Sequence, residues 1–124
     1  MSDWRIRMSE IDRGHLVVEE RGDITIVKFT DKMLMGEQLI AAIGEHLGNL
    51  VDNLRRRNLR LDFTGVEYIA SHVLGKFVHV FKKLQAVSGT LVFCNLGPQC
   101  FKTFQIAKLD KFFQFEAAPI KPTA

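Results

Sequence analysis

Two short runs near the start of the chain carry the residue types of β-strands. Leu16–Glu20 and Ile24–Phe29 are rich in β-branched residues, and Arg21-Gly22-Asp23 between them has the composition of a turn. The second run places apolar side chains on both of its faces, which is typical of a strand inside a sheet. The pattern predicts a β-hairpin whose second strand has a neighbour on each side.

Helical periodicity follows this hairpin. From Glu37 to about Arg56, apolar residues recur every three or four positions, which predicts a helix with one buried stripe. Leu59, Leu61 and Phe63 then alternate with polar residues as a strand.

A second helix is predicted to begin near residue 70 and to end at Ser88-Gly89. One face of this helix carries the apolar residues Val73, Phe77, Val80, Phe81 and Leu84, and the lysines Lys76, Lys82 and Lys83 lie outside it.

The last third of the chain repeats the alternation of strand and helix. Thr90–Leu96 is an apolar run of the kind found in buried strands, and Gly97-Pro98 opens a third helix, because proline suits the first helical turn. This helix is predicted to bury Phe101, Phe104 and Ile106.

The order of elements is therefore β-β-α-β-α-β-α with a short final strand or helix. Strands that alternate with helices predict an α/β fold: a small mixed, mostly parallel sheet of four to five strands with helices packed on it. We expect one such domain over residues 15–117, preceded by a leader (residues 1–14) and followed by a tail (residues 118–124).

Composition narrows the function classes. The 124 residues are 47% hydrophobic and 25% charged, which is ordinary for a folded protein, and the net charge of +3 is spread among acidic residues rather than gathered on a nucleic-acid-binding face. The start lacks a signal-peptide pattern and no apolar run is long enough to span a membrane. Cys94 and Cys100 are not in a CxxC motif and are expected to be reduced thiols. We therefore expect a cytoplasmic protein without nucleic-acid binding or membrane insertion.

Motifs for catalysis are missing from the sequence. It has no G-x-S-x-G elbow and no glycine-rich phosphate loop, and its four histidines and two cysteines lack zinc-ligand spacing. Ser71 and His72 are adjacent, so on a helix they diverge by about 100° and do not form a nucleophile–base pair. The sequence therefore predicts no metal, no cofactor and no enzyme, with a small hydrolase as the weakest alternative.

Some residues have two interpretations. Phe112, Phe113 and Phe115 are more crowded than a core requires, so either all three are buried or one is exposed. The arginines at 55–57 and Arg60 are expected to be solvated charges at a helix end, and Asp62 is expected to accept hydrogen bonds from loop amides.

The segment from Leu59 to Phe115 resembles the anti-sigma-factor antagonist family of STAS domains. The resemblance rests on a strand that ends LRLDFTG, a glycine before the next strand at Gly89, an Asn-Leu turn at Asn95-Leu96 and a Leu-Asp-Lys-Phe ending at residues 109–112. It implies the STAS fold, which agrees with the order of elements predicted above.

Family members that switch by phosphorylation carry Asp-Ser-Ser/Thr-Gly-Leu at the start of the second long helix. This chain has Ala70-Ser71-His72-Val73-Leu74, so the phosphoacceptor position is His72. The usual phosphorylation switch is therefore expected to be lost. Ser71 is the one candidate phosphosite, although we favour a role as helix N-cap. A phosphohistidine or a pH sensor at His72 is less favoured than a surface residue that contacts a partner.

The resemblance implies a regulatory protein–protein interaction domain that binds an anti-sigma factor with serine kinase character. The expected interface residues are Ser71, His72, Val73, Lys76 and His79. The alternatives within the family are a stressosome scaffold and a subunit of a lipid-transporting ABC complex. The oligomeric state stays open, with a homodimer as one option.

Overall fold

The computed structural model describes residues 15–116, and these form two sheets and a layer of helices. The strands are β1 (Leu16–Arg21), β2 (Ile24–Phe29), β3 (Met33–Leu34), β4 (Asn58–Asp62), β5 (Tyr68–Ile69), β6 (Thr90–Cys94) and β7 (Gln114–Glu116). The helices are α2 (Glu37–Asp52), α3 (Ser71–Ala86) and α4 (Pro98–Ile106).

The main sheet has five strands in the order β1-β2-β4-β6-β7. β1 pairs antiparallel with β2, and the other neighbours are parallel. The predicted hairpin is therefore confirmed, and β2 has a neighbour on each side as its two apolar faces indicated. The mostly parallel α/β architecture is also confirmed, and the short final element is the edge strand β7.

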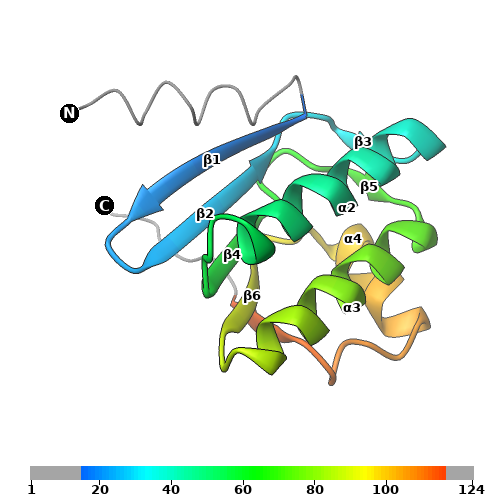
Figure 1. Ribbon diagram of the computed structural model, residues 1–124. Coiled ribbons are helices and arrows are strands. Elements are labelled where there is room, and N and C mark those ends of the chain that lie inside the picture. The colour runs from blue at the N-terminus through cyan, green and yellow to red at the C-terminus, as the bar shows by residue number, and fades with distance from the viewer. Residues whose placement is uncertain (1–14, 117–124) are drawn as a thin grey trace.

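The three helices lie on one side of this sheet (Figure 1). Alternate residues of the inner strands point toward them: Leu59 and Leu61 of β4 pair with Leu91 and Phe93 of β6, and all four are buried. Phe77 of α3 is fully buried in the centre of the layer between sheet and helices. No helix within residues 15–116 is both long and apolar enough to cross a membrane.

A cluster of phenylalanine rings fills this core. The ring of Phe77 lies 5.4 Å from that of Phe93 and 5.9 Å from that of Phe63, both edge to face, and stacks on Phe104 at 6.3 Å. Edge-to-face and offset-stacked pairs are favourable beyond the area that they bury. Phe77 of α3 is thereby packed against β6, α4 and Phe63, which directly follows β4.

Helix α2 ends at Asp52, four residues earlier than predicted. The backbone of Arg55 is left-handed (φ 56°), and the N–H of Arg56 donates to the carbonyl of Leu50 at 2.8 Å, so the chain turns back over the helix end. Arg56 then lies 2.9 Å from the carboxylate of Glu20. The expectation of solvated charges at a helix end is therefore wrong for Arg56. It is also wrong for Arg60, which lies within β4 and pairs with Glu116.

The C-terminal segment contains one wrong prediction and resolves one open question. Ile106 is 73% exposed, because it is the last residue of α4 and the buried face of that helix is formed by Cys100 and Phe104 instead. Of the crowded phenylalanines, Phe113 is buried and Phe112 is 46% exposed. The leader (residues 1–14) and the tail (residues 118–124) lie outside the described residues.

Truncation of Phe77 is expected to destabilise the domain strongly. Phe77→Ala removes a fully buried ring and leaves a cavity between the sheet and the helices, so the free energy of unfolding should fall by about 3–5 kcal/mol. Phe112→Ala is the matched control, since its half-exposed ring should cost about 1 kcal/mol. Urea unfolding of both variants measures the difference, and equal losses would contradict the central position of Phe77.

Strand β7 is attached by an ion pair whose contribution depends on pH. Arg60 of β4 reaches across β6 and donates to both carboxylate oxygens of Glu116 at 2.5 and 2.9 Å, and these hydrogen bonds lower the pKa of Glu116 from its ordinary 4.5. Because the folded pKa is depressed, the stabilisation is present above the unfolded pKa and is lost as pH falls through the folded value.

Glu116→Gln should therefore destabilise the domain near neutral pH and have a diminishing effect in acid. The measurement is the free energy of unfolding of wild type and variant over a series from about pH 7 to pH 2. Glu67→Gln, at an exposed glutamate, is the control. A difference between wild type and Glu116→Gln that stays constant over this range would rule out the ion pair as its cause.

Candidate functional site

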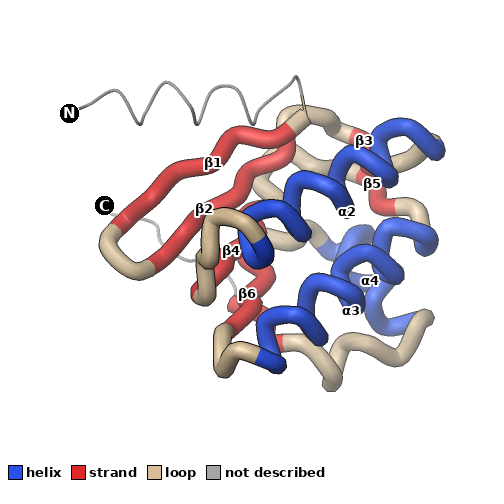
Figure 2. The backbone as a smooth tube through the Cα atoms, viewed as in Figure 1, coloured by secondary structure: helices blue, strands red, loops and turns tan. Residues whose placement is uncertain are grey.

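The start of α3 is held in place by a small second sheet. β3 and β5 pair in parallel, with Met33 opposite Tyr68 and Leu34 opposite Ile69, and the N–H of Ala70 donates to the carbonyl of Leu34 at 2.9 Å. Figure 2 shows this pair of strands beside the first turns of α2, apart from the main sheet. Ala70 is thereby kept extended (φ −72°, ψ 145°), and the helix begins at the next residue.

This start carries no side-chain cap. The cap position is Ala70, and Ser71 is already the first helical residue, so the expected cap bond from Ser71 is not formed. No acidic residue lies in the first turn of α3 either. Its first N–H groups therefore keep the partial positive charge of a helix N-terminus.

Asp62 fixes the loop that leads toward this helix. Its Oδ1 accepts hydrogen bonds from the backbone N–H of Thr64 (3.0 Å), the hydroxyl of Thr64 (2.7 Å) and the side-chain amide of Asn95 (2.9 Å). Partial burial alone would raise the pKa of Asp62, but the hydrogen bonds from Asn95 and Thr64 lower it overall. The prediction of a structural acceptor is confirmed, and the bond to Asn95 links the ends of β4 and β6.

The predicted interface residues do not all lie on the surface. Ser71, His72 and His79 are exposed, and Lys76 is half-buried. Val73 is 0% exposed and belongs to the core, so its assignment to the interface is wrong. The third residue of α3 faces inward because it shares a helix face with Phe77.

A surface groove of about 890 Å³ runs between the starts of α2 and α3. His72, Lys76 and His79 line it on the α3 side, and Met35 and Ile40 line it on the α2 side. Ser71 is not among its lining residues. The groove therefore brings together three of the five predicted residues and adds an apolar wall that the sequence analysis missed.

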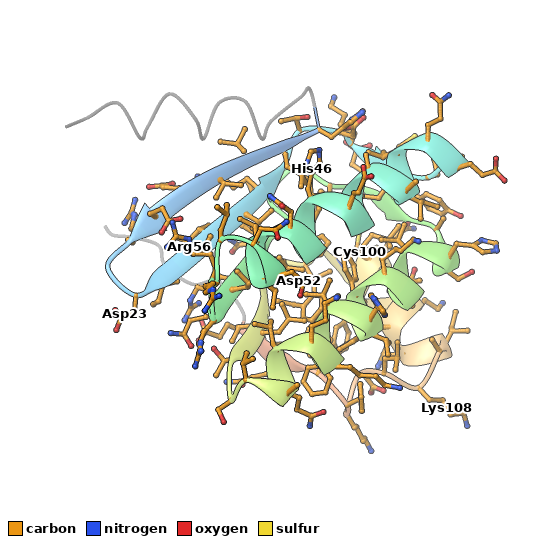
Figure 3. The ribbon with its side chains drawn as sticks, in the orientation of Figure 1. Asp23, His46, Asp52, Arg56, Cys100 and Lys108 are labelled. Carbon is orange, nitrogen blue, oxygen red and sulfur yellow. The ribbon has the colours of Figure 1, made fainter. Side chains whose placement is uncertain are left out.

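Lysine side chains of α3 lie over glycines of α2. A Cβ atom added at Gly44 would be 2.8 Å from Lys76 Cδ, and one at Gly48 would be 4.0 Å from Lys83 Cε. Lys83 Nζ then pairs with Asp52 at 2.8 Å; Asp52 lies at the end of α2 (Figure 3). In these contacts the residue numbers increase in the same direction along both helices, so α2 and α3 run parallel. Two successive crossovers of a parallel sheet require this direction.

An exposed apolar patch adjoins the groove. Met33, Met35 and Tyr68 are 50%, 48% and 44% exposed, and Met33 and Tyr68 are neighbours in the small sheet. The sequence signal for this patch was the position of Met33 and Met35 on either side of the buried Leu34. A run of three residues is too short to distinguish a strand from a loop. Exposed apolar clusters on a folded domain mark interaction surfaces.

The metal-ligating and thiol groups of the described residues bear on the chemistry of the site. No group of three His, Cys, Asp or Glu side chains with the geometry of a metal site occurs in the described part of the chain. Burial raises the pKa of both thiols, Cys94 and Cys100, which keeps them protonated and weakly nucleophilic. What the site offers instead is a helix start, a groove and an apolar rim.

Comparison with known proteins agrees with this architecture. The family model for the STAS domain matches residues 15–123. A search of curated protein sequences gives no match.

Solved structures of similar fold include a STAS-domain anti-sigma-factor antagonist from Planctomyces limnophilus (TM-score 0.73, 18% identity), with 84% of this chain and 90% of that chain covered. An anti-sigma factor antagonist from Mycobacterium paratuberculosis has a TM-score of 0.67 and 22% identity, with 85% of each chain covered. The phosphorylated form of the Bacillus cell fate determinant SpoIIAA has a TM-score of 0.59 and 17% identity, over 82% of this chain and 90% of that chain. At these identities the likeness concerns the fold. Together with the family match over most of its length, it shows that this chain belongs to the STAS domain family.

Proposed function

We propose that this domain is a regulatory module that works by docking a partner protein on the start of α3, in the manner of an anti-sigma-factor antagonist. The observation that carries the proposal is the combination found at one place: an uncapped helix start, a groove of about 890 Å³ and an apolar rim. Structures with the same fold bear the name anti-sigma factor antagonist, which supports this choice of partner class.

The partner is an anti-sigma factor of the serine kinase type. Such a protein would place apolar side chains against Met35 and Ile40 and polar or acidic groups near Lys76 and the start of α3. A helix N-terminus favours acceptors and anions, and a rim of methionines adapts to partner side chains. The same features explain why an added negative charge at the helix start would oppose docking of an acidic partner.

We propose that this domain lacks the usual phosphorylation switch of the family. His72 lies at the phosphoacceptor position of the family, and Val73, which stands at the glycine position, is part of the core. Ser71 retains an exposed hydroxyl one residue earlier. We infer a domain held in the unphosphorylated, binding-competent form, with Ser71 as its one candidate phosphosite.

A negative charge at His72 should weaken docking without harming the fold. His72→Asp places a carboxylate in the first turn of α3, where the helix dipole favours it, so the free energy of unfolding should be unchanged or slightly raised. Affinity for the anti-sigma factor kinase encoded in the same genome should fall about tenfold or more, as measured by isothermal titration calorimetry. Gln105→Asp on α4 is the matched control, and equal affinities for both variants would contradict docking at this site.

Phosphorylation is tested separately with the same kinase, ATP and mass spectrometry of the intact protein. The wild-type chain should gain no phosphate, because the hydroxyl at the family position is missing. Ala70→Asp/His72→Ser restores the acid and the hydroxyl of the family motif and should be modified under the same conditions. Stoichiometric phosphate on the wild-type protein that is lost in Ser71→Ala would overturn the inference of a missing switch.

A further inference from the structure

Two neighbouring helices of this domain carry charges of opposite sign. The Asp and Glu residues of α2 are Glu37, Glu45 and Asp52, and this helix contains no Lys or Arg. The lysines of α3 are Lys76, Lys82 and Lys83, and this helix contains no Asp or Glu. Because α2 and α3 lie side by side, their shared outer face is acidic along one half and basic along the other.

Little of this charge is neutralised within the chain. Lys83 pairs with Asp52 at 2.8 Å, and that is the single ion pair between the two helices in residues 15–116. Glu37 and Glu45 are exposed, and Lys76 lies along Gly44 without an acidic partner in the described part of the chain. These charges therefore lie on one surface without ion-pair partners in the described part of the chain.

We propose that this face, formed by the outer sides of α2 and α3, docks a second copy of the same chain. A two-fold axis parallel to the two helices places α2 of one copy opposite α3 of the other. Every contact of such an isologous interface occurs twice, so the acidic helix of each copy meets the basic helix of its mate. Charge complementarity therefore selects a second copy as the occupant and selects this orientation over the antiparallel one, which would oppose like charges.

The register of the helices favours the same arrangement. Lys76 lies beside Gly44, so Glu45 is at the level of Lys76 along the common helix direction. Rotation about a parallel axis preserves this level. Glu45 of one copy then faces Lys76 of the other, and Asp52 likewise comes to the level of Lys83.

The size and composition of the face indicate a weak dimer. A 16-residue helix is about 24 Å long, and two helices packed about 10 Å apart present a strip about 20 Å wide, so roughly 1,000 Å² in total would be buried. This is below the range of stable complexes and within that of transient ones. The side chains of Lys76 and Lys83 lie over Gly44 and Gly48, so the second copy would meet these lysine side chains rather than bare helix backbone. The dimer would also cover the groove, so self-association and partner docking would compete.

The test is sedimentation of the purified chain alone, over a series of protein concentrations. At an ionic strength of about 0.01 M, where screening extends over about 30 Å, the average mass should rise with concentration toward that of a dimer. At about 1 M, where the screening length is about 3 Å, the chain should stay monomeric. The self-association does not depend on the identity of the docking partner, so the result is independent of the proposed function.

Charge reversal decides whether this face is responsible. Lys76→Glu and Glu45→Lys should each weaken dimerisation about tenfold or more, because each creates two like-charge contacts. The double variant Lys76→Glu/Glu45→Lys restores opposite charges and should recover dimerisation to near the wild-type level. Lys102→Glu, an exposed lysine on α4, is the control for net charge and should have little effect.

Circular dichroism and thermal unfolding establish that each variant is folded before it is sedimented. A chain that remains monomeric at low ionic strength at every concentration overturns the proposal. So does a dimer that is unaffected by Lys76→Glu, or a folded double variant that fails to recover.

Discussion

The site of this domain depends on one short parallel ladder, β3 with β5, and on the hydrogen bond from Ala70 N–H to the Leu34 carbonyl that ends it. β3 leads into α2 through Met35 and Gly36, and β5 leads into α3 through Ala70. The same ladder therefore sets where both helices begin. Gly36 makes the turn possible, since its φ of 95° is readily adopted only by glycine. The groove exists because these two helix starts are fixed side by side.

Packing in the core and a hydrogen bond between strand ends hold this arrangement in place. The ring of Phe77, the seventh residue of α3, is surrounded by rings from the sheet and from α4, which fixes the direction of the helix. Asp62 and Asn95 join the ends of two central strands next to the loop that precedes β5. A rigid frame of this kind allows an exposed apolar rim and an uncapped helix to persist, although each costs stability on its own.

The sequence was informative where many residues share one pattern. The hairpin, the alternation of strands with helices and the buried faces of α2 and α3 each rest on runs of five or more residues, and these predictions are confirmed. Two-residue strands give too few positions to show a period, so β3 and β5 were missed. Val73 was assigned to the interface because it lies in the segment that matches the family motif. The helical period already placed it on the same buried face as Phe77, and that period was the better guide. The groove is a product of tertiary packing and has no local signal.

The proposed absence of a phosphorylation switch changes how such a surface would be regulated. In a STAS domain with a hydroxyl at the family position, added phosphate would bring negative charge to a helix start that otherwise attracts acceptors. Here the same position is His72, and the adjacent Val73 is packed in the core. Under the proposed function, this domain does not use that route. Regulation by a second copy that covers the binding surface needs no covalent change. A face with Glu45 and Lys76 at the same level along parallel helices can be covered by its own copy when the protein is abundant and uncovered when a tighter partner competes.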